Sequence, residues 1–193
     1  MPENQTEIAK NAFLKHQEVA DKSLESLIPG IEKSGEILLD VAKNNRFMFA
    51  CGNGGSAADS QHLVGEWVCR YKDDRKPLRA VALSVDTSVL TAIGNDYGYE
   101  EIFKRQVEAL GNEGDVLVVF STSGTSPNVV KAVEQAKKQK LTIIALTGQR
   151  GVELNRLADV AVVVPSIETA RIQEIHKIII HIWCEYIDSN LKP

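Results

Sequence analysis

The sequence is poor in cysteine and has no long apolar run. Only three of its 193 residues are cysteines, Cys51, Cys69 and Cys184, and no two of them lie close together in the chain. This scattered, odd-numbered set excludes a small disulfide scaffold and is typical of reduced thiols packed as small hydrophobic residues. No uncharged apolar run approaches the roughly 18 residues of a membrane span, so we expect no membrane partner.

Positive charge is not in excess either. Lysine and arginine number 22 and aspartate and glutamate 26, which gives a formal net charge of −4. We expect no nucleic-acid partner, because general binding to nucleic acid requires a cationic surface. Residues 1–7 hold no basic region followed by an apolar stretch, so we also expect no secretion signal and a cytoplasmic location.

The composition is that of an ordinary globular protein. Hydrophobic residues make up 44% of the chain and charged residues 25%, which excludes intrinsic disorder and collagen-like structure. At roughly 150 residues per domain, the length predicts a single domain over residues 1–193.

Short apolar runs alternate with helical patterns over most of the chain. Runs rich in valine, isoleucine and leucine cover residues 46–51, 80–83, 116–120, 142–146 and 160–164. Helical patterns cover residues 57–71, 88–93, 102–110, 128–138 and 153–157, and the tail 168–191 reads as one long amphipathic helix. The strands are apolar on both faces, which predicts an α/β fold with a five-stranded parallel sheet between two layers of helices.

Residues 1–44 exceed what such a sheet needs. Apolar residues at helical spacing predict two helices here, broken at Pro29-Gly30. Either this N-terminal extension adds cover to the core, or it packs against another copy of the chain in an oligomer.

Two loops that follow predicted strands have the chemistry of an anion site. Residues 52–56 read Gly-Asn-Gly-Gly-Ser, and residues 121–126 read Ser-Thr-Ser-Gly-Thr-Ser. Each loop alone could be a tight turn or a helix cap. In a parallel sheet, however, ligands bind beyond the carboxyl ends of the strands, where glycines and hydroxyls can surround a phosphate. The Walker and dinucleotide-binding patterns are both absent, so the pair of loops favours a small phosphorylated ligand.

Four polar side chains could supply acid–base or metal chemistry. His62 and Glu66 are four residues apart and share one helix face, while Gln173 and His181 lie on the final helix. Singly, each has a structural explanation as a surface pair or as a hydrogen-bonded core residue. His181 needs a partner, because it interrupts an isoleucine-rich stretch.

Several of these segments resemble one known family. The residues Cys-Gly-Asn-Gly-Gly-Ser-Ala-Ala-Asp at 51–59, His62 through Glu66, Gly-Asn-Asp-Tyr-Gly at 94–98, Ser-Thr-Ser-Gly at 121–124 and Ile-Gln-Glu at 172–174 occur in this order. The sequence is similar to the phosphoheptose isomerases, which act on sedoheptulose 7-phosphate and belong to the sugar isomerase (SIS) superfamily. The hydroxyl loop alone indicates only the superfamily, whereas the joint presence of His62, Glu66, Gln173 and His181 is more specific.

The resemblance implies a function and a set of site residues. It implies an aldose–ketose isomerase that converts D-sedoheptulose 7-phosphate to D-glycero-D-manno-heptose 7-phosphate through a cis-enediol, as the first step towards nucleotide-activated heptose for lipopolysaccharide or capsule. The catalytic pair would be Glu66 and His181. The positions that match the family's substrate contacts are Asn53, Gly54, Gly55, Ser56, Glu66, Asn95, Asp96, Ser121, Thr122, Ser123, Ser126 and Gln173.

The resemblance also implies a metal and an assembly. His62, Glu66, Gln173 and His181 match the ligands of one zinc ion per subunit, although glutamine is an unusual zinc ligand. The expected assembly is a homotetramer with active sites at subunit interfaces. An alternative is a non-catalytic SIS-domain protein that binds the bacterial replication initiator. We expect such proteins to lack the acidic residue at position 66 and the histidine at position 181, and this sequence has both.

Overall fold

The computed structural model describes residues 4–191 and confirms the parallel sheet. All pairings between its strands are parallel, and the strands lie in the order β2-β1-β3-β4-β5. The strands are β1 (Met48–Gly52), β2 (Ala80–Ala82), β3 (Val116–Ser121), β4 (Thr142–Gly148) and β5 (Val160–Val164).

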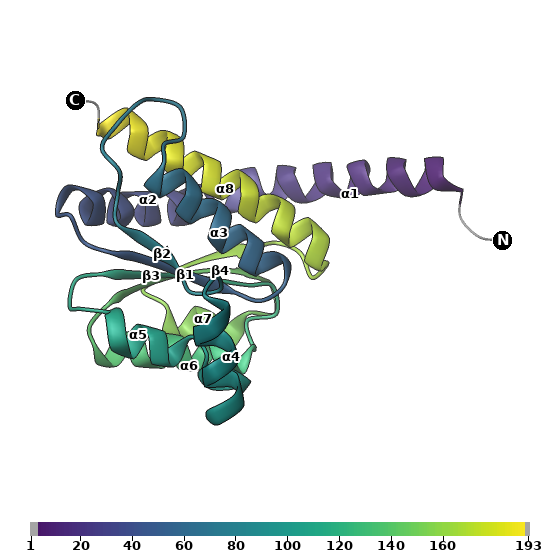
Figure 1. The fold of residues 1–193 in the computed structure, drawn as a ribbon. Helices are drawn as coiled ribbons and strands as arrows, with labels where there is room; N and C mark the ends of the chain where they lie inside the picture. Colours follow the sequence, from purple (N-terminus) through teal and green to yellow (C-terminus); the bar gives the residue numbers. More distant parts are fainter. Residues whose placement is uncertain (1–3, 192–193) are drawn as a thin grey trace.

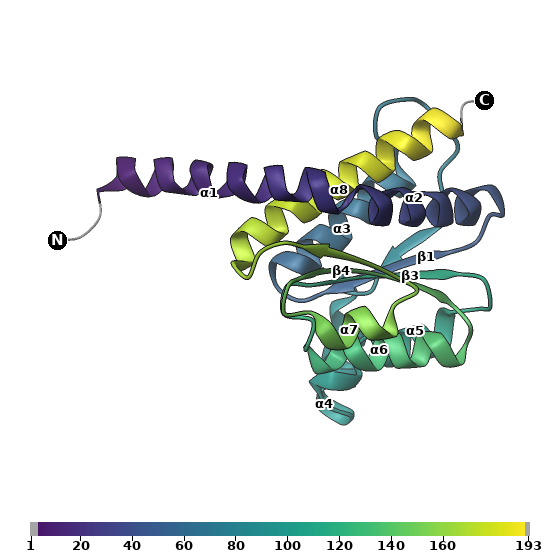
Figure 2. The same ribbon diagram turned by 180° about the vertical axis from the view of Figure 1, so that it is seen from behind.

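Helices cover both faces of this sheet, as predicted (Figures 1 and 2). One layer contains α1 (Gln5–Ser26), α2 (Ile28–Lys43), α3 (Gly55–Val68) and α8 (Thr169–Asn190). The other contains α4 (Thr87–Asp96), the 3-10 turn η1 (Tyr99–Glu101), α5 (Lys104–Leu110), α6 (Pro127–Lys138) and α7 (Val152–Leu157). Within residues 4–191, no helix combines the length and apolar character that a membrane span requires.

The apolar runs form strands because side chains on both faces of the sheet are buried. Met48 and Ala50 point into the core under α2, α3 and α8, while Phe49 and Cys51 point into the core over α5 and α6. A β-strand places successive side chains on opposite faces. A central strand between two helix layers therefore needs apolar residues at every position.

The two N-terminal helices are separated at Leu27 and not at Pro29-Gly30 as predicted. Pro29 lies in the first turn of α2, where its missing N–H would have no helical partner in any case. It therefore starts the helix and does not break one.

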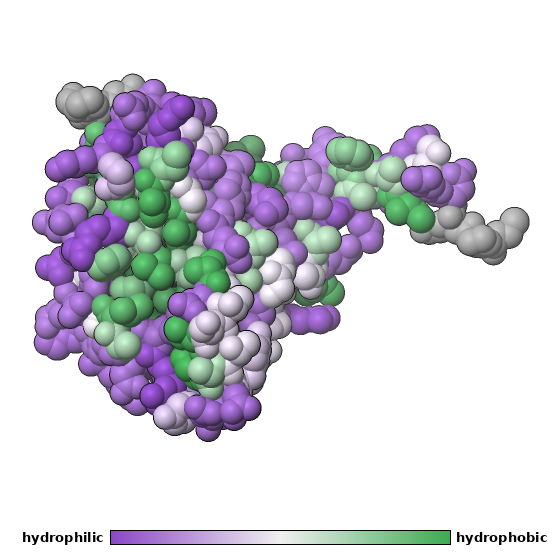
Figure 3. All heavy atoms as spheres, in the orientation of Figure 1, coloured by the Kyte–Doolittle hydropathy of each residue, from purple (hydrophilic) through white to green (hydrophobic). Residues whose placement is uncertain are grey.

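The two N-terminal helices differ in how they lie against the core. Helix α2 covers the core, and the indole N–H of Trp183 in α8 donates to Ser34 Oγ at 3.0 Å. Helix α1 projects from the body of the molecule (Figure 1), and apolar side chains stand among polar ones on its projecting part (Figure 3). Among them, Ile8, Phe13 and Leu14 are 52%, 78% and 63% exposed.

The strand order fixes where a ligand site can form. From β1 the chain moves outward to β2 on one side, and β3 lies on the other side of β1. The carboxyl ends of β1 and β3 are thus the topological switch point, where ligands bind in open α/β sheets. Gly52 at the end of β1 pairs with Phe120 near the end of β3, so the glycine loop and the hydroxyl loop flank this point.

Candidate active site at the ends of β1 and β3

The loop after β1 is a tight turn that only glycine permits at two positions. A Cβ on Gly52 would lie 2.7 Å from the Ser56 carbonyl oxygen and 2.8 Å from that of Phe120. Gly54 has a φ of +56°, in the left-handed region that favours glycine. The N–H of buried Ser56 donates to the Asn53 carbonyl at 3.0 Å. The glycines therefore bring the start of α3 close to the end of β1.

The loop after β3 is also held by its own hydroxyls. Ser121 Oγ accepts from the Gly124 N–H at 3.1 Å, and Ser123 Oγ accepts from the Thr125 N–H at 3.3 Å. Gly124 has a φ of +66° and packs against the backbone of Gly151. The Ser126 side chain, by contrast, makes no capping bond at the start of α6, which leaves its hydroxyl available to a ligand.

A pocket of about 420 Å³ joins the two loops. Its lining residues are Asn53, Tyr99, Glu100, Ser126, Pro127 and Asn128. Asn53 and Ser126 are predicted substrate contacts, so the structure brings one residue from each loop to the same pocket. Tyr99 and Asn128 were missed by the sequence reasoning. Tyr99 follows the segment 94–98 by one residue, and Asn128 follows the hydroxyl loop by two. This closeness to predicted site segments was the only sequence signal for the two residues.

The predicted acid–base residues form a cluster between α3 and α8. His62 Nε2 lies 3.3 Å from Glu66 Oε1 and 3.3 Å from His181 Nε2. The Tyr71 ring stacks on His181, with 5.4 Å between the ring centroids. Partial burial, with the nearby His62 adding to it, lowers the pKa of His181. At neutral pH His181 is therefore an uncharged imidazole that can both accept and donate a proton.

Gln173 lies at a different point along the same pair of helices. A Cβ on Gly55 would lie 2.6 Å from Gln173 Nε2, so this amide sits directly over the first residue of α3. His181 is eight residues further along α8, about 12 Å at the usual helical rise. Gln173 is therefore beside the glycine loop and not in the His62–Glu66–His181 cluster.

This spacing decides how far the chain fits the expected zinc site. In this structure the Gln173 amide packs on Gly55 and not on the His62–Glu66–His181 cluster, whereas zinc ligand atoms must all lie about 2 Å from the ion. Within residues 4–191, no three His, Cys, Asp or Glu side chains are arranged to hold a metal ion. One chain therefore does not form the four-ligand site, and we assign no chemical step to zinc.

Asn95 and Asp96 lie outside both clusters. They are exposed at the end of α4, and Asn95 Nδ2 donates to Asp96 Oδ1 at 2.8 Å. These two side chains thus hydrogen-bond to each other.

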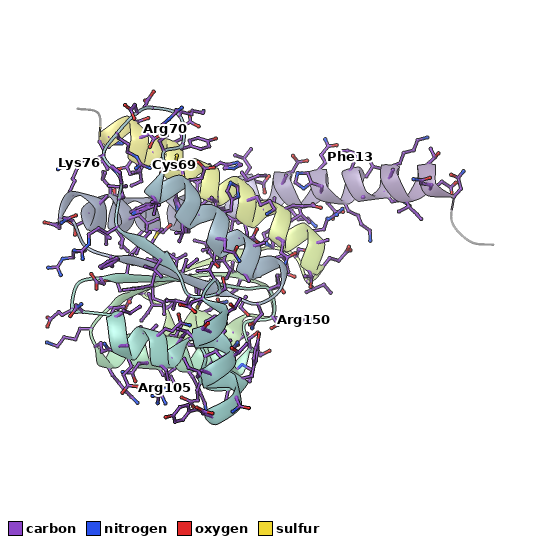
Figure 4. All side chains as sticks on the ribbon, in the orientation of Figure 1. Phe13, Cys69, Arg70, Lys76, Arg105 and Arg150 are labelled. Carbon is purple, nitrogen blue, oxygen red and sulfur yellow. The ribbon has the colours of Figure 1, made fainter. Side chains whose placement is uncertain are left out.

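A buried ion pair holds the chain segment beside the acid–base cluster. Arg75 Nε donates to Asp188 Oδ1 at 2.7 Å, and these side chains are only 3% and 2% exposed. Asp188 also accepts from the backbone N–H of Lys72 at 2.7 Å, and Arg75 Nη2 donates to the Glu66 carbonyl at 2.8 Å. The pair fixes the segment after α3, which carries Tyr71 and passes the end of α8 (Figure 4).

Known proteins resemble this chain over nearly its full length. The model of the SIS domain family matches residues 13–148. The phosphoheptose isomerase of Helicobacter pylori strain P12 is 50% identical over 184 residues, which is 95% of this chain and 96% of that protein. The phosphoheptose isomerase of Campylobacter jejuni strain 81116 is 50% identical over 183 residues, or 95% of this chain and 98% of that protein.

Solved structures of similar proteins share the fold. The phosphoheptose isomerase of Neisseria gonorrhoeae superposes with a TM-score of 0.91 at 42% identity, covering 96% of this chain and all of that one. A phosphoheptose isomerase of Francisella tularensis gives a TM-score of 0.93 at 35% identity, covering 97% of this chain and all of that one.

Proposed function

The chain belongs to the phosphoheptose isomerases of the SIS-domain family, and from this membership we propose how its own residues carry out the reaction. It is an aldose–ketose isomerase that converts D-sedoheptulose 7-phosphate to D-glycero-D-manno-heptose 7-phosphate. The observation that carries the assignment is the 50% identity over 95% of the chain to a phosphoheptose isomerase. The site geometry supports the role of each residue.

The hydroxyl loop holds the phosphate. Ser121, Thr122, Ser123 and Ser126 stand where β3 ends and α6 begins, and the Ser126 hydroxyl lines the pocket. Hydroxyls, backbone N–H groups and the start of a helix stabilise an anion without lysine or metal. The chain's net charge of −4 therefore does not prevent binding of a sugar phosphate. This binding orients the reacting end of the sugar.

The proton transfers use Glu66 and His181. Glu66 takes the C1 proton of the ketose and returns it at C2 of the cis-enediol, and His181 moves a proton between O1 and O2. The lowered pKa of His181 supports its role, because a neutral imidazole can serve in both directions. His62 lies within 3.3 Å of both residues and orients them.

The non-catalytic alternative is disfavoured by this cluster. A protein that only binds the replication initiator does not need a carboxylate and an imidazole brought together by a third residue. Here Glu66 and His181 both approach His62 across the α3–α8 contact. The initiator-binding alternative gains support only if the purified protein fails to turn over the sugar phosphate.

The functional unit is a homotetramer in this proposal. The exposed apolar residues of α1, among them Phe13, form a projecting surface that a second copy would cover. Light scattering of the wild type and Phe13→Asp tests this. We expect a tetramer that dissociates in the variant, and a monomeric wild type contradicts the proposal.

Zinc and the metabolic context complete the proposal. His62, Glu66 and His181 of one chain would hold a zinc ion only if a neighbouring copy completed the ligand set, and a bound zinc would supply Lewis-acid chemistry. The product is the first intermediate on the route to nucleotide-activated heptose for lipopolysaccharide or capsule, and we place the enzyme in the cytoplasm.

Product formation tests the function directly. The purified protein is incubated with sedoheptulose 7-phosphate, with and without a chelator, and the aldose is followed by NMR. We expect turnover, and a fall in turnover with chelator accompanied by loss of zinc in the protein's measured metal content. Absence of turnover in the metal-loaded tetramer contradicts the proposed function. Full turnover of zinc-free protein removes zinc alone from the proposal.

A further inference from the structure

The two ligand loops are joined by a buried asparagine that no functional motif contains. Asn128 is the second residue of α6 and is only 2% exposed. It exchanges two hydrogen bonds with Asn53 of the glycine loop. Asn53 Nδ2 donates to Asn128 Oδ1 and Asn128 Nδ2 donates to Asn53 Oδ1, each at 2.9 Å. The loop after β1 is thus locked to the helix after β3.

The backbone decides which way both amides face. The N–H of Val129 donates to Asn128 Oδ1 at 3.0 Å. A backbone N–H can only donate, so the atom it meets must be the amide oxygen of Asn128. The same oxygen then accepts from Asn53, which requires that Asn53 present its NH₂ group there.

A third group completes the acceptor side of Asn53. The Tyr99 hydroxyl donates to Asn53 Oδ1 at 3.2 Å. Lys131 holds the turn that carries Tyr99, because its ammonium lies 2.6 Å from Glu100 Oε1 and 2.7 Å from Glu101 Oε1. Asn53 Oδ1 therefore accepts two hydrogen bonds, its full capacity, while Asn53 Nδ2 has donated only one of its two hydrogens.

We propose that Asn128 is a positioning residue that fixes Asn53 as a hydrogen-bond donor to an oxygen of the sugar phosphate. Asn53 lines the same pocket as Ser126, so a donor on Asn53 and the hydroxyl loop can serve one ligand. Asn128 acts through Asn53 and does not touch the reacting atoms. This inference rests on the proposed function and deepens it.

A double-mutant cycle separates this role from a merely structural one. The proteins are the wild type, Asn128→Ala, Asn53→Ala and the double variant, each checked by thermal unfolding. We expect each single substitution to raise KM for sedoheptulose 7-phosphate roughly 10- to 100-fold, the value of a hydrogen bond to a charged group, with a smaller change in kcat. Asn128 also lines the pocket but is only 2% exposed. The inference gives it no ligand contact of its own, so the double variant should match Asn53→Ala.

Two further variants keep the test decisive. Tyr99→Phe removes one hydroxyl from a side chain that is 65% exposed, so the fold is retained. It should raise KM less than Asn128→Ala does. Asn44→Ala is a control at an exposed asparagine that precedes the amino end of β1, away from the pocket, and it should leave KM unchanged.

The possible outcomes distinguish failure of this inference from failure of the proposed function. Independent, multiplying effects of Asn128→Ala and Asn53→Ala overturn the inference, as does an unchanged KM in a folded Asn128→Ala protein. If the wild type binds sedoheptulose 7-phosphate in titration calorimetry without turning it over, the proposed function fails. The same cycle measured by binding then decides the inference.

Discussion

The buried histidine of α8 should make stability depend on pH in a way that one substitution removes. His176 is fully buried, its ring packs edge-on against Phe120, and neither ring nitrogen has a hydrogen-bond partner of normal geometry. Burial lowers the pKa of His176 from its usual 6.5 to about 4, Lys177 adds to the effect, and the backbone of Thr147 opposes it. Unfolding exposes the ring and restores its ordinary pKa.

The size of the effect follows from the two pKa values. Below pH 6.5 the unfolded state binds a proton at His176 that the native state does not bind, so stability falls as pH falls towards 4. At 1.36 kcal/mol for each tenfold change, the limiting loss is about 3.4 kcal/mol. About 2 kcal/mol of this loss falls between pH 7 and pH 4.5. Leucine at this position does not titrate, so His176→Leu should abolish this part of the pH dependence.

Urea unfolding at pH 7, 5.5 and 4.5 measures the effect in the wild type and His176→Leu. We expect the free energy of unfolding of the wild type to drop by about 2 kcal/mol relative to the variant between pH 7 and pH 4.5. His16→Gln is the control substitution and should leave this part of the pH dependence in place. His16 is only half-buried and hydrogen-bonds to Glu174. Parallel pH profiles for the wild type and His176→Leu would refute the reasoning.

Two further substitutions test the supports of the site. Asp188→Asn removes the charge that pairs with buried Arg75 and should lower the free energy of unfolding in urea by about 3 kcal/mol. A change below about 0.5 kcal/mol, the usual size for a surface substitution, would contradict the buried-pair account. Gly124→Ala places a Cβ against the Gly151 backbone at a positive φ and should raise KM at least tenfold. Gly30→Ala, where a Cβ meets only ordinary contacts from 3.5 Å, should not, and equal KM values for the two variants would disprove the loop argument.

The parallel sheet and its two helix layers follow from patterns that can be read in the sequence, whereas the strand order was not predicted. The apolar runs identified all five strands, since a strand buried on both faces is apolar at most positions. Boundaries were less predictable. The helix expected over residues 57–71 ends at Val68, because Arg75 and Asp188 fix the chain that follows. The predicted break at Pro29 was wrong, because proline in a first helical turn starts a helix.

The site was predictable in parts and not as a whole. Each loop can be recognised in the sequence by its glycine or hydroxyl residues directly after a predicted strand. The contacts that assemble the site join distant residues, as in Asn53 with Asn128 and His62 with His181, and no local pattern encodes them. The separation of Gln173 from His181 could have been foreseen, since eight residues of helix span about 12 Å.

The measurement that tests the central claim most directly is kcat for sedoheptulose 7-phosphate in Glu66→Gln and His181→Gln. Glutamine keeps the approximate shape of each side chain and removes its capacity to transfer a proton. We predict that each variant folds and that kcat falls by at least about 100-fold, the lower range for general acid–base catalysis. Glu108→Gln, an exposed control on α5, should retain full activity. Turnover by either site variant within a few-fold of the wild type would contradict the assignment of Glu66 and His181 as the proton-transfer pair.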